Sequence, residues 1–170
     1  MRRSLRALAL AAGVVFAARP AAAGEISYPI KSVAVVDFDY RDTSGEVRDQ
    51  SREHRARLDA FMAKLRADLG ADPRLAVVTI ACADPPCSAG NMPPTALMDA
   101  ARRAGAQLLL YGQIHKMSTL VQWGRVQIVD VASDRLLDDK LLTFRGDTDE
   151  AWLRAEAFIA QELKSGNFAE

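Results

Sequence analysis

The chain has 170 residues, of which 49% are hydrophobic and 26% are charged, and it carries 22 basic and 22 acidic side chains. This length is close to that of a single domain and allows one substantial hydrophobic core. The lack of a basic excess argues against nucleic acid or an anionic membrane surface as the main partner, because both are bound through clustered lysine and arginine.

The first 23 residues have the order of an export signal. Three arginines within the first six residues precede an apolar run over residues 7–18, and Ala21–Ala23 supplies the small side chains that a signal peptidase recognises. The apolar run is shorter than the roughly 20 residues that a transmembrane helix requires. We therefore expect cleavage near Ala23, a product located in the periplasm, and no integral membrane anchor.

Removal of residues 1–23 takes away four arginines and no acidic residue, which leaves 18 basic and 22 acidic side chains. No cysteine directly follows the expected cleavage site, so we expect no lipid anchor either. The remainder contains no repeat, linker or low-complexity stretch. We expect a single domain over residues 24–165 and a short tail over residues 166–170.

The first expected element of this domain is a strand over Ser32–Tyr40, which begins with apolar side chains on both faces. Such a strand is typical of the centre of a sheet that is covered on both sides. A polar turn follows over residues 41–45, and Thr43 with Glu46 matches a capping box that opens a helix. Apolar residues at helical spacing predict that this helix is long, amphipathic and ended by a glycine. The apolar residues and the glycine are Leu58, Phe61, Met62, Leu65, Leu69 and Gly70.

The middle of the chain predicts a second strand over residues 75–80 and a proline-containing loop over residues 81–87. A second helix is expected over residues 94–104, with Gly105 as its stop.

Three closely spaced strands follow, over residues 107–116, 121–131 and 136–144, with a turn over residues 132–135 between the last two. Gly124 interrupts the alternation of apolar and polar residues, which indicates a β-bulge.

A final helix is expected after Asp147 or Thr148, either of which can cap it. Asp149 and Glu150 lie in the first turn, where carboxylates complement the helix dipole. The apolar stripe of this helix consists of Trp152, Ala155, Ile159 and Leu163.

The predicted order of elements is β-α-β-α-β-β-β-α. Two β-α-β crossovers require parallel neighbours, whereas the last three strands can form an antiparallel meander. The sequence therefore predicts an α/β (α+β) fold with a single mixed β-sheet of about five strands and helices packed on the sheet.

Three segments of the chain carry a resemblance to known proteins. Gly105–Ser118, Asp130 and Phe144–Trp152 together resemble a bacterial family of secreted proteins of unknown function. Val33–Phe38 is similar to the first strand of the amino-terminal domain of the Tol-Pal propeller protein and of curli-secretion-like domains. The resemblance implies an α/β periplasmic module of a kind that mostly contacts proteins, and it supplies no catalytic residues.

Cys82 and Cys87 are the two cysteines of the chain, and a four-residue spacer with two prolines separates them. In an exported protein this spacing favours a structural disulfide. A thiol-exchange pair and a metal site are the alternatives, although the redox motif has a two-residue spacer and a zinc site needs further ligands.

Asp37 and Asp39 are the first candidate site residues, because they project from one face of the first strand near its carboxyl end. Open α/β sheets commonly bind ligands at that end. A divalent cation or a polar ligand could bind there. The alternative is structural, with Asp37 capping a turn or pairing with an arginine and Asp39 solvated.

His115 and Lys116 lie together near the end of the third expected strand and could join the same site, whereas His54 lies on the long helix. A histidine can act as an acid or a base, but hydrolytic catalysis also requires an activated nucleophile and an oriented partner. The chain has no nucleophile elbow, zinc-protease motif or phosphate-binding glycine loop, and we expect neither a cofactor nor a bound metal.

These observations rank three classes of function. The first is a non-enzymatic module that docks to another envelope or periplasmic protein through a sheet edge or an exposed loop. The second is a protein that binds a small ligand or a divalent metal through Asp37, Asp39, His115 and Lys116. An enzyme is the third.

Overall fold

A computed structural model describes residues 30–82 and 86–166, so that the expected export signal and residues 167–170 lie outside the described residues. Within them the chain forms six strands and three helices. In chain order these elements are β1 (Lys31–Val35), β2 (Asp39–Asp42), α1 (Ser51–Gly70), β3 (Leu75–Val78), α2 (Pro94–Arg103), β4 (Leu108–Lys116), β5 (Val121–Asp130), β6 (Arg135–Arg145) and α3 (Asp149–Ser165).

The six strands form one mixed sheet in the order β3-β1-β4-β5-β6, with β2 pairing to β4 beyond the end of β1. The pairs β1–β3, β1–β4 and β2–β4 are parallel, whereas β4–β5 and β5–β6 are antiparallel. The α1 and α2 connections are long enough to cross over the sheet, which parallel pairing requires. The predicted α/β fold with a mixed sheet and packed helices is therefore confirmed.

The first predicted strand is split into β1 and β2 by a bulge. Val35 pairs with Leu110 and Asp39 pairs with Gln113, so that one extra residue lies on the β1–β2 side. Phe38 within this bulge packs over Gly112, where an added Cβ would lie 2.8 Å from the Phe38 ring and 2.6 Å from a backbone oxygen. Because a one-residue shift exchanges the two faces of a strand, the bulge directs Asp42 toward the helices and Asp39 away from them.

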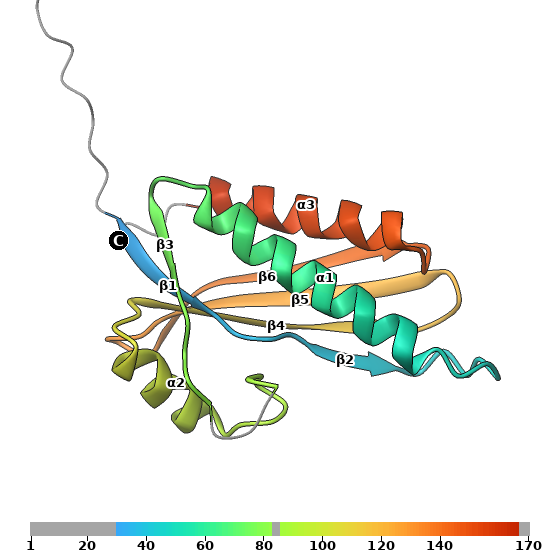
Figure 1. The fold of residues 1–170 in the computed structure, drawn as a ribbon, viewed down its shortest axis with the longest axis horizontal. Helices are drawn as coiled ribbons and strands as arrows, with labels where there is room; N and C mark the ends of the chain where they lie inside the picture. The colour runs from blue at the N-terminus through green and yellow to red at the C-terminus, as the bar shows by residue number, and fades with distance from the viewer. Residues whose placement is uncertain (1–29, 83–85, 167–170) are drawn as a thin grey trace, which may run out of the picture.

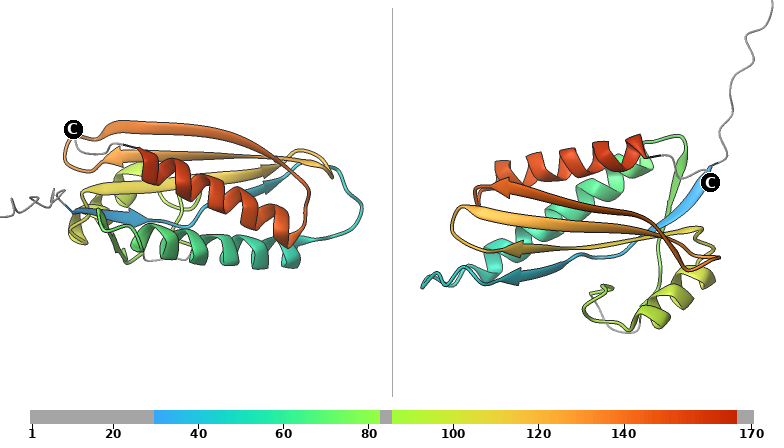
Figure 2. Two further views of the ribbon diagram at one scale, coloured as in Figure 1. Left: turned by 90° about the horizontal axis from the view of Figure 1, so that it is seen from above. Right: turned by 180° about the vertical axis from the view of Figure 1, so that it is seen from behind.

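Helices α1 and α3 lie side by side along one face of the sheet (Figures 1 and 2). The main core lies between these helices and the sheet, and it includes Val33, Val35, Leu108, Leu110, Phe61, Leu65, Trp152 and Ile159. A smaller core lies on the other face, where α2 packs its Leu97 and Ala101 against Ala34, Val36 and Leu109. The α2 side of the sheet is thus covered over β1 and the first half of β4.

Two predicted helix features are confirmed. Gly70 is the last residue of α1, and the stripe predicted for the final helix is buried. Thr148 rather than Asp147 caps α3, because its hydroxyl accepts a hydrogen bond from the Ala151 amide.

Two other local predictions are wrong. Thr43 and Glu46 form no capping box, since α1 begins at Ser51 and its N-cap residue, Gln50, makes no side-chain cap. Gly124 pairs regularly with Ile114 and Leu142, and the irregular step of β5 lies between Ile128 and Val129 instead.

The structure joins Cys82 and Cys87 by a disulfide, with their Cα atoms 5.7 Å apart. The predicted covalent link is present and closes the loop that follows β3. In the part of the chain that the structure describes, no helix is both long and apolar enough to cross a membrane.

Candidate functional site

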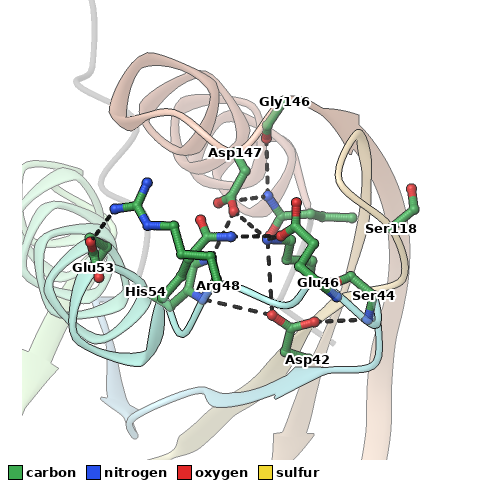
Figure 3. A network of polar contacts seen from close by, with 12 residues as sticks. Asp42, Ser44, Glu46, Arg48, Glu53, His54, Ser118, Gly146 and Asp147 are labelled. Atoms are coloured by element: carbon green, nitrogen blue, oxygen red, sulfur yellow. Dashed lines mark hydrogen bonds and ion pairs between the residues drawn. The ribbon is translucent and has the colours of Figure 1, made fainter.

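A largely buried group of charged and polar side chains gathers where β2 and β4 end and where α1 and α3 begin (Figure 3). We call it the Asp147 cluster. It consists of Asp42, Glu46, His54, Arg57, Lys116, Gln122 and Asp147.

Asp147 is the centre of this cluster. Its Oδ2 lies 2.7 Å from Nε2 of His54 and 2.7 Å from Nζ of Lys116. Its Oδ1 accepts a hydrogen bond from Arg57 at 2.9 Å and weaker ones from Trp152 and Gln122, at 3.3 and 3.4 Å. One carboxylate thus connects both strands of the β4–β5 hairpin to the first turns of both long helices.

Lys116 is the most deeply buried charge of the cluster, with a side chain that is 0% exposed. Besides Asp147 it contacts the carboxylate of Glu46, which also accepts a hydrogen bond from Gln50, and it lies 3.9 Å from that of Asp42. A buried ammonium is tolerated only when it is paired and hydrogen-bonded, because its desolvation alone costs several kcal/mol. The contact with Glu46 therefore fastens the segment before α1 to the end of β4.

These contacts set the charge states. Burial by itself raises the pKa of Asp147, but hydrogen bonds from His54 and Lys116 outweigh burial and hold it at about 2. Burial by itself lowers the pKa of Lys116, and the carboxylates of Asp147 and Glu46 reverse that effect and raise it above its usual value. Both groups are charged across the physiological range as a result.

Aromatic side chains lie beside the Asp147 cluster. The Tyr40 ring lies 4.9 Å from the His54 ring and 5.8 Å from the Trp152 ring, measured between centroids. Burial raises the pKa of the Tyr40 phenol, and the neighbouring carboxylates of Asp42 and Asp147 raise it further. The Tyr40 hydroxyl oxygen is buried and has no hydrogen-bond partner among the described residues.

The cluster holds together elements from distant parts of the chain. In residues 30–82 and 86–166, the ring nitrogens of His54 approach only carboxylates, those of Asp147 and Asp42. The charges of the cluster pair with one another, which is the arrangement of a structural ion network.

Asp37 and Asp39, predicted as a ligand-binding strand end, lie together and hold the loop after the disulfide. Asp37 forms an ion pair with Arg66 at 2.6 Å and accepts a hydrogen bond from the Cys87 amide at 3.2 Å. Asp39 accepts hydrogen bonds from the Ser88 hydroxyl at 2.5 Å and the Gly90 amide at 2.8 Å. Both carboxylates are engaged by the protein's own groups.

His115 and Lys116 are adjacent in sequence but lie on opposite faces of the sheet. Nε2 of His115 lies 2.6 Å from the Thr43 hydroxyl, and its ring contacts Trp123 edge-on with centroids 5.1 Å apart. This pair belongs to the face that α1 and α3 do not cover. The four predicted ligand residues are thus not brought to one point.

A cleft of about 760 Å³ lies between residues 37–42, which include β2, and α1, beside the Asp147 cluster. Asp37, Asp39, Asp42, Glu46 and His54 are among its lining residues. Among the described residues no group of three or more His, Cys, Asp or Glu side chains is arranged to hold a metal ion.

The comparison with protein families decides the classification of this chain. The profile of a family described as "Protein of unknown function (DUF2380)", labelled DUF3280, matches residues 31–163. The chain belongs to this family. The match contains every strand of the sheet and the whole Asp147 cluster. A comparison with curated proteins finds no match.

Solved structures share the fold of this family member at low sequence identity. Hypothetical protein CT253 from Chlamydia trachomatis is 14% identical, with a TM-score of 0.54 over 79% of this chain and 96% of that chain. The PelC dodecamer from Paraburkholderia phytofirmans is 16% identical, with a TM-score of 0.53 over 83% of this chain and 90% of that chain. TolB from Acinetobacter baumannii matches at 18% identity and a TM-score of 0.48, over 82% of this chain and 30% of that chain. The first two matches show a common fold alone.

Sequence reasoning gave Lys116 as a candidate ligand residue and Asp147 only as a possible helix cap, and it did not identify the contact between them or their other partners. A usable signal was the alternation in β4, where Leu108, Leu110 and Ile114 are buried and Lys116 continues the same face. A lysine at a buried position requires a carboxylate nearby. The carboxylates that pair with Lys116 could not be predicted, because Asp42, Glu46 and Asp147 come from three separate loops and strand ends.

Proposed function

We propose that this family member is an exported, non-enzymatic interaction module of the bacterial cell envelope, which works by docking to another protein. The observation that carries this proposal is a pair of large apolar side chains, Leu141 on the edge strand β6 and Phe158 on α3, which remain exposed and line one hollow. Leu136 on β6 and Leu153 on α3 are exposed as well. Exposed apolar side chains that gather on neighbouring elements mark interaction surfaces more often than single ones do.

Two observations support export. The first 23 residues have the charge, apolar run and small residues of a cleaved signal. The Cys82–Cys87 disulfide is a bond that persists in oxidising compartments such as the periplasm.

Among the proteins of similar fold, PelC forms a dodecamer, so this fold is used at least once in a protein assembly.

The state of the charged residues supports a role without catalysis. The strongest candidates for acid–base work, His54 and Asp147, are saturated by partners inside the Asp147 cluster. Asp37 and Asp39 likewise hold the loop around Cys87.

Affinity capture tests the proposal. The tagged full chain is expressed in a bacterium, recovered after export, and incubated with a native envelope extract that retains divalent ions. We expect one protein to be retained in stoichiometric amount and to be displaced by excess untagged chain. The same preparation is screened by thermal shift against metals and periplasmic metabolites, since a ligand that binds the folded state raises its Tm. Retention of no protein, together with a rise of several degrees in Tm for one compound, would favour ligand binding at the Asp37–Asp39 strand end instead.

A further inference from the structure

We propose that the free edge of β6, over residues 141–145, receives an extended segment of the partner protein that carries apolar side chains and carboxylates. This inference rests on the proposed docking function and specifies its surface and the chemistry of its partner. A strand added to an open sheet edge is held by main-chain hydrogen bonds, and its side chains provide the specificity.

The first step of the argument is the position of a hollow of about 470 Å³. It is lined by five consecutive residues of β6, from Leu141 to Arg145, and by residues of α3. Consecutive residues of a strand point to opposite faces of the sheet. They can line a single hollow only if that hollow runs along the edge of the strand, and β6 is the terminal strand of the sheet.

The second step is the lack of protection at this part of the edge. Natural edge strands are commonly protected by charged side chains, prolines or bulges. In β6 the charges of Asp138, Asp139 and Lys140 occupy the middle of the strand, whereas residues 141–144 are Leu-Leu-Thr-Phe. Leu141 is 71% exposed, and Phe158 on α3, which lines the same hollow, is 53% exposed.

The third step is charge. Arg145 and Arg154 both line the hollow. Neither forms an ion pair with a carboxylate in the described part of the chain, whereas six other arginines do. Two cations beside an apolar strand edge favour an incoming segment with acidic residues.

The same arginines argue against a second copy of this chain as the occupant. Two copies paired edge to edge about a two-fold axis at residues 141–145 would bring Arg145 and Arg154 of both copies to the same interface. Juxtaposed like charges disfavour an interface. A different protein with an acidic, apolar strand fits better.

Two fluorescein-labelled peptides of about eight residues test the proposal, a length typical of a strand. In one peptide valine alternates with glutamate, and in the other lysine replaces glutamate. Binding to the full-length chain is measured by fluorescence anisotropy, and the position of binding by hydrogen exchange of the backbone amides. We expect the glutamate peptide to bind at least about tenfold more tightly than the lysine peptide, and to slow exchange over residues 141–145.

Charge reversal then identifies the residues responsible. Arg145→Glu combined with Arg154→Glu should reverse the preference between the two peptides. Both side chains are exposed, so the fold should survive, and circular dichroism checks this. Arg103→Glu, an exposed arginine at the end of α2, is the matched control and should leave the preference unchanged.

Three results would overturn this inference: no binding of either peptide, equal binding of both, or protection at elements other than β6. The arginines would then serve to keep the edge from pairing. The capture experiment separates this failure from that of the proposed function. If the double variant retains the same envelope protein as the wild type, docking occurs through another surface. If no protein is retained by either, the docking function itself is wrong.

Discussion

Replacing Asp147 by alanine should destabilise the whole domain, because this carboxylate balances more buried positive charge than any other in the described structure. The substitution leaves the fully buried Lys116 with Glu46 and the more distant Asp42 as its counter-charges. Removing one partner of a buried ion pair costs roughly 3–5 kcal/mol. Because Glu46 remains as a partner of Lys116, we expect a loss at the lower end of this range, about 3 kcal/mol of unfolding free energy.

Urea and thermal unfolding measure this effect. For a domain of this size, about 3 kcal/mol corresponds to a fall in Tm of about 10 °C. Asp149→Ala is the matched control: Asp149 is two residues away and also binds Arg57, but its side chain is 79% exposed. Surface ion pairs contribute at most about 1 kcal/mol, so the control should lose little. A loss in Asp147→Ala no larger than in Asp149→Ala would refute the reasoning.

The pH dependence gives an independent measure. The pKa of Asp147 is held at about 2, below its ordinary value of 3.8. A carboxyl with a depressed pKa contributes stability above its unfolded-state pKa and loses that contribution as the pH falls toward the folded-state pKa. The wild type should therefore lose about 2 kcal/mol more than Asp147→Ala between pH 5 and pH 2. Parallel pH profiles of the two proteins would contradict this account.

Three other predictions concern separate parts of the fold. Replacing Cys82 and Cys87 by serine should lower the unfolding free energy by about 2 kcal/mol, and thiol titration of the denatured, unreduced wild type should find almost no free thiol. Gly112→Ala should cost about 2 kcal/mol or more in urea unfolding, because the added Cβ would lie 2.6 Å from a backbone oxygen and 2.8 Å from the Phe38 ring; a neutral effect would mean that the β1–β2 bulge is not rigid. Burial raises the pKa of Glu156, so its ionisation above the unfolded-state value opposes folding. Glu156→Gln should therefore raise the Tm more at pH 7 than at pH 4, and an equal change at both pH values would contradict this.

The Asp147 cluster and the β6 edge are two distinct regions of the molecule. Buried ion pairs join several elements in the first, and the second is a strand edge with no further strand paired to it. The cluster ties Glu46, Lys116 and the start of α3 together, and α3 in turn forms one wall of the hollow beside β6. A loss of the cluster should therefore weaken docking indirectly, through the position of α3. Charge reversal at Arg145 and Arg154 should weaken it without a comparable loss of stability.

The order and type of most elements could be predicted from local sequence. The helical spacing of Phe61, Met62, Leu65 and Leu69 already specified which face of α1 is buried, because a period of 3.6 residues leaves one apolar stripe. Close spacing of the last three strands indicated an antiparallel meander, since short connections allow no crossover. The short spacer between Cys82 and Cys87 likewise made their disulfide predictable.

Features that depend on register or on contacts between distant segments could not be predicted. A single extra residue between Val35 and Asp39 exchanged the two faces of the first strand, and nothing in the local pattern reveals such a bulge. The separation of His115 from Lys116 follows from alternation within β4, but the partners of Lys116 come from positions 70 and 31 residues away in the chain. Sequence alone thus determined which segments form helices and strands, because that depends on neighbours along the chain. Tertiary structure decided which charges are buried together and which edge stays open, because both depend on how distant segments pack.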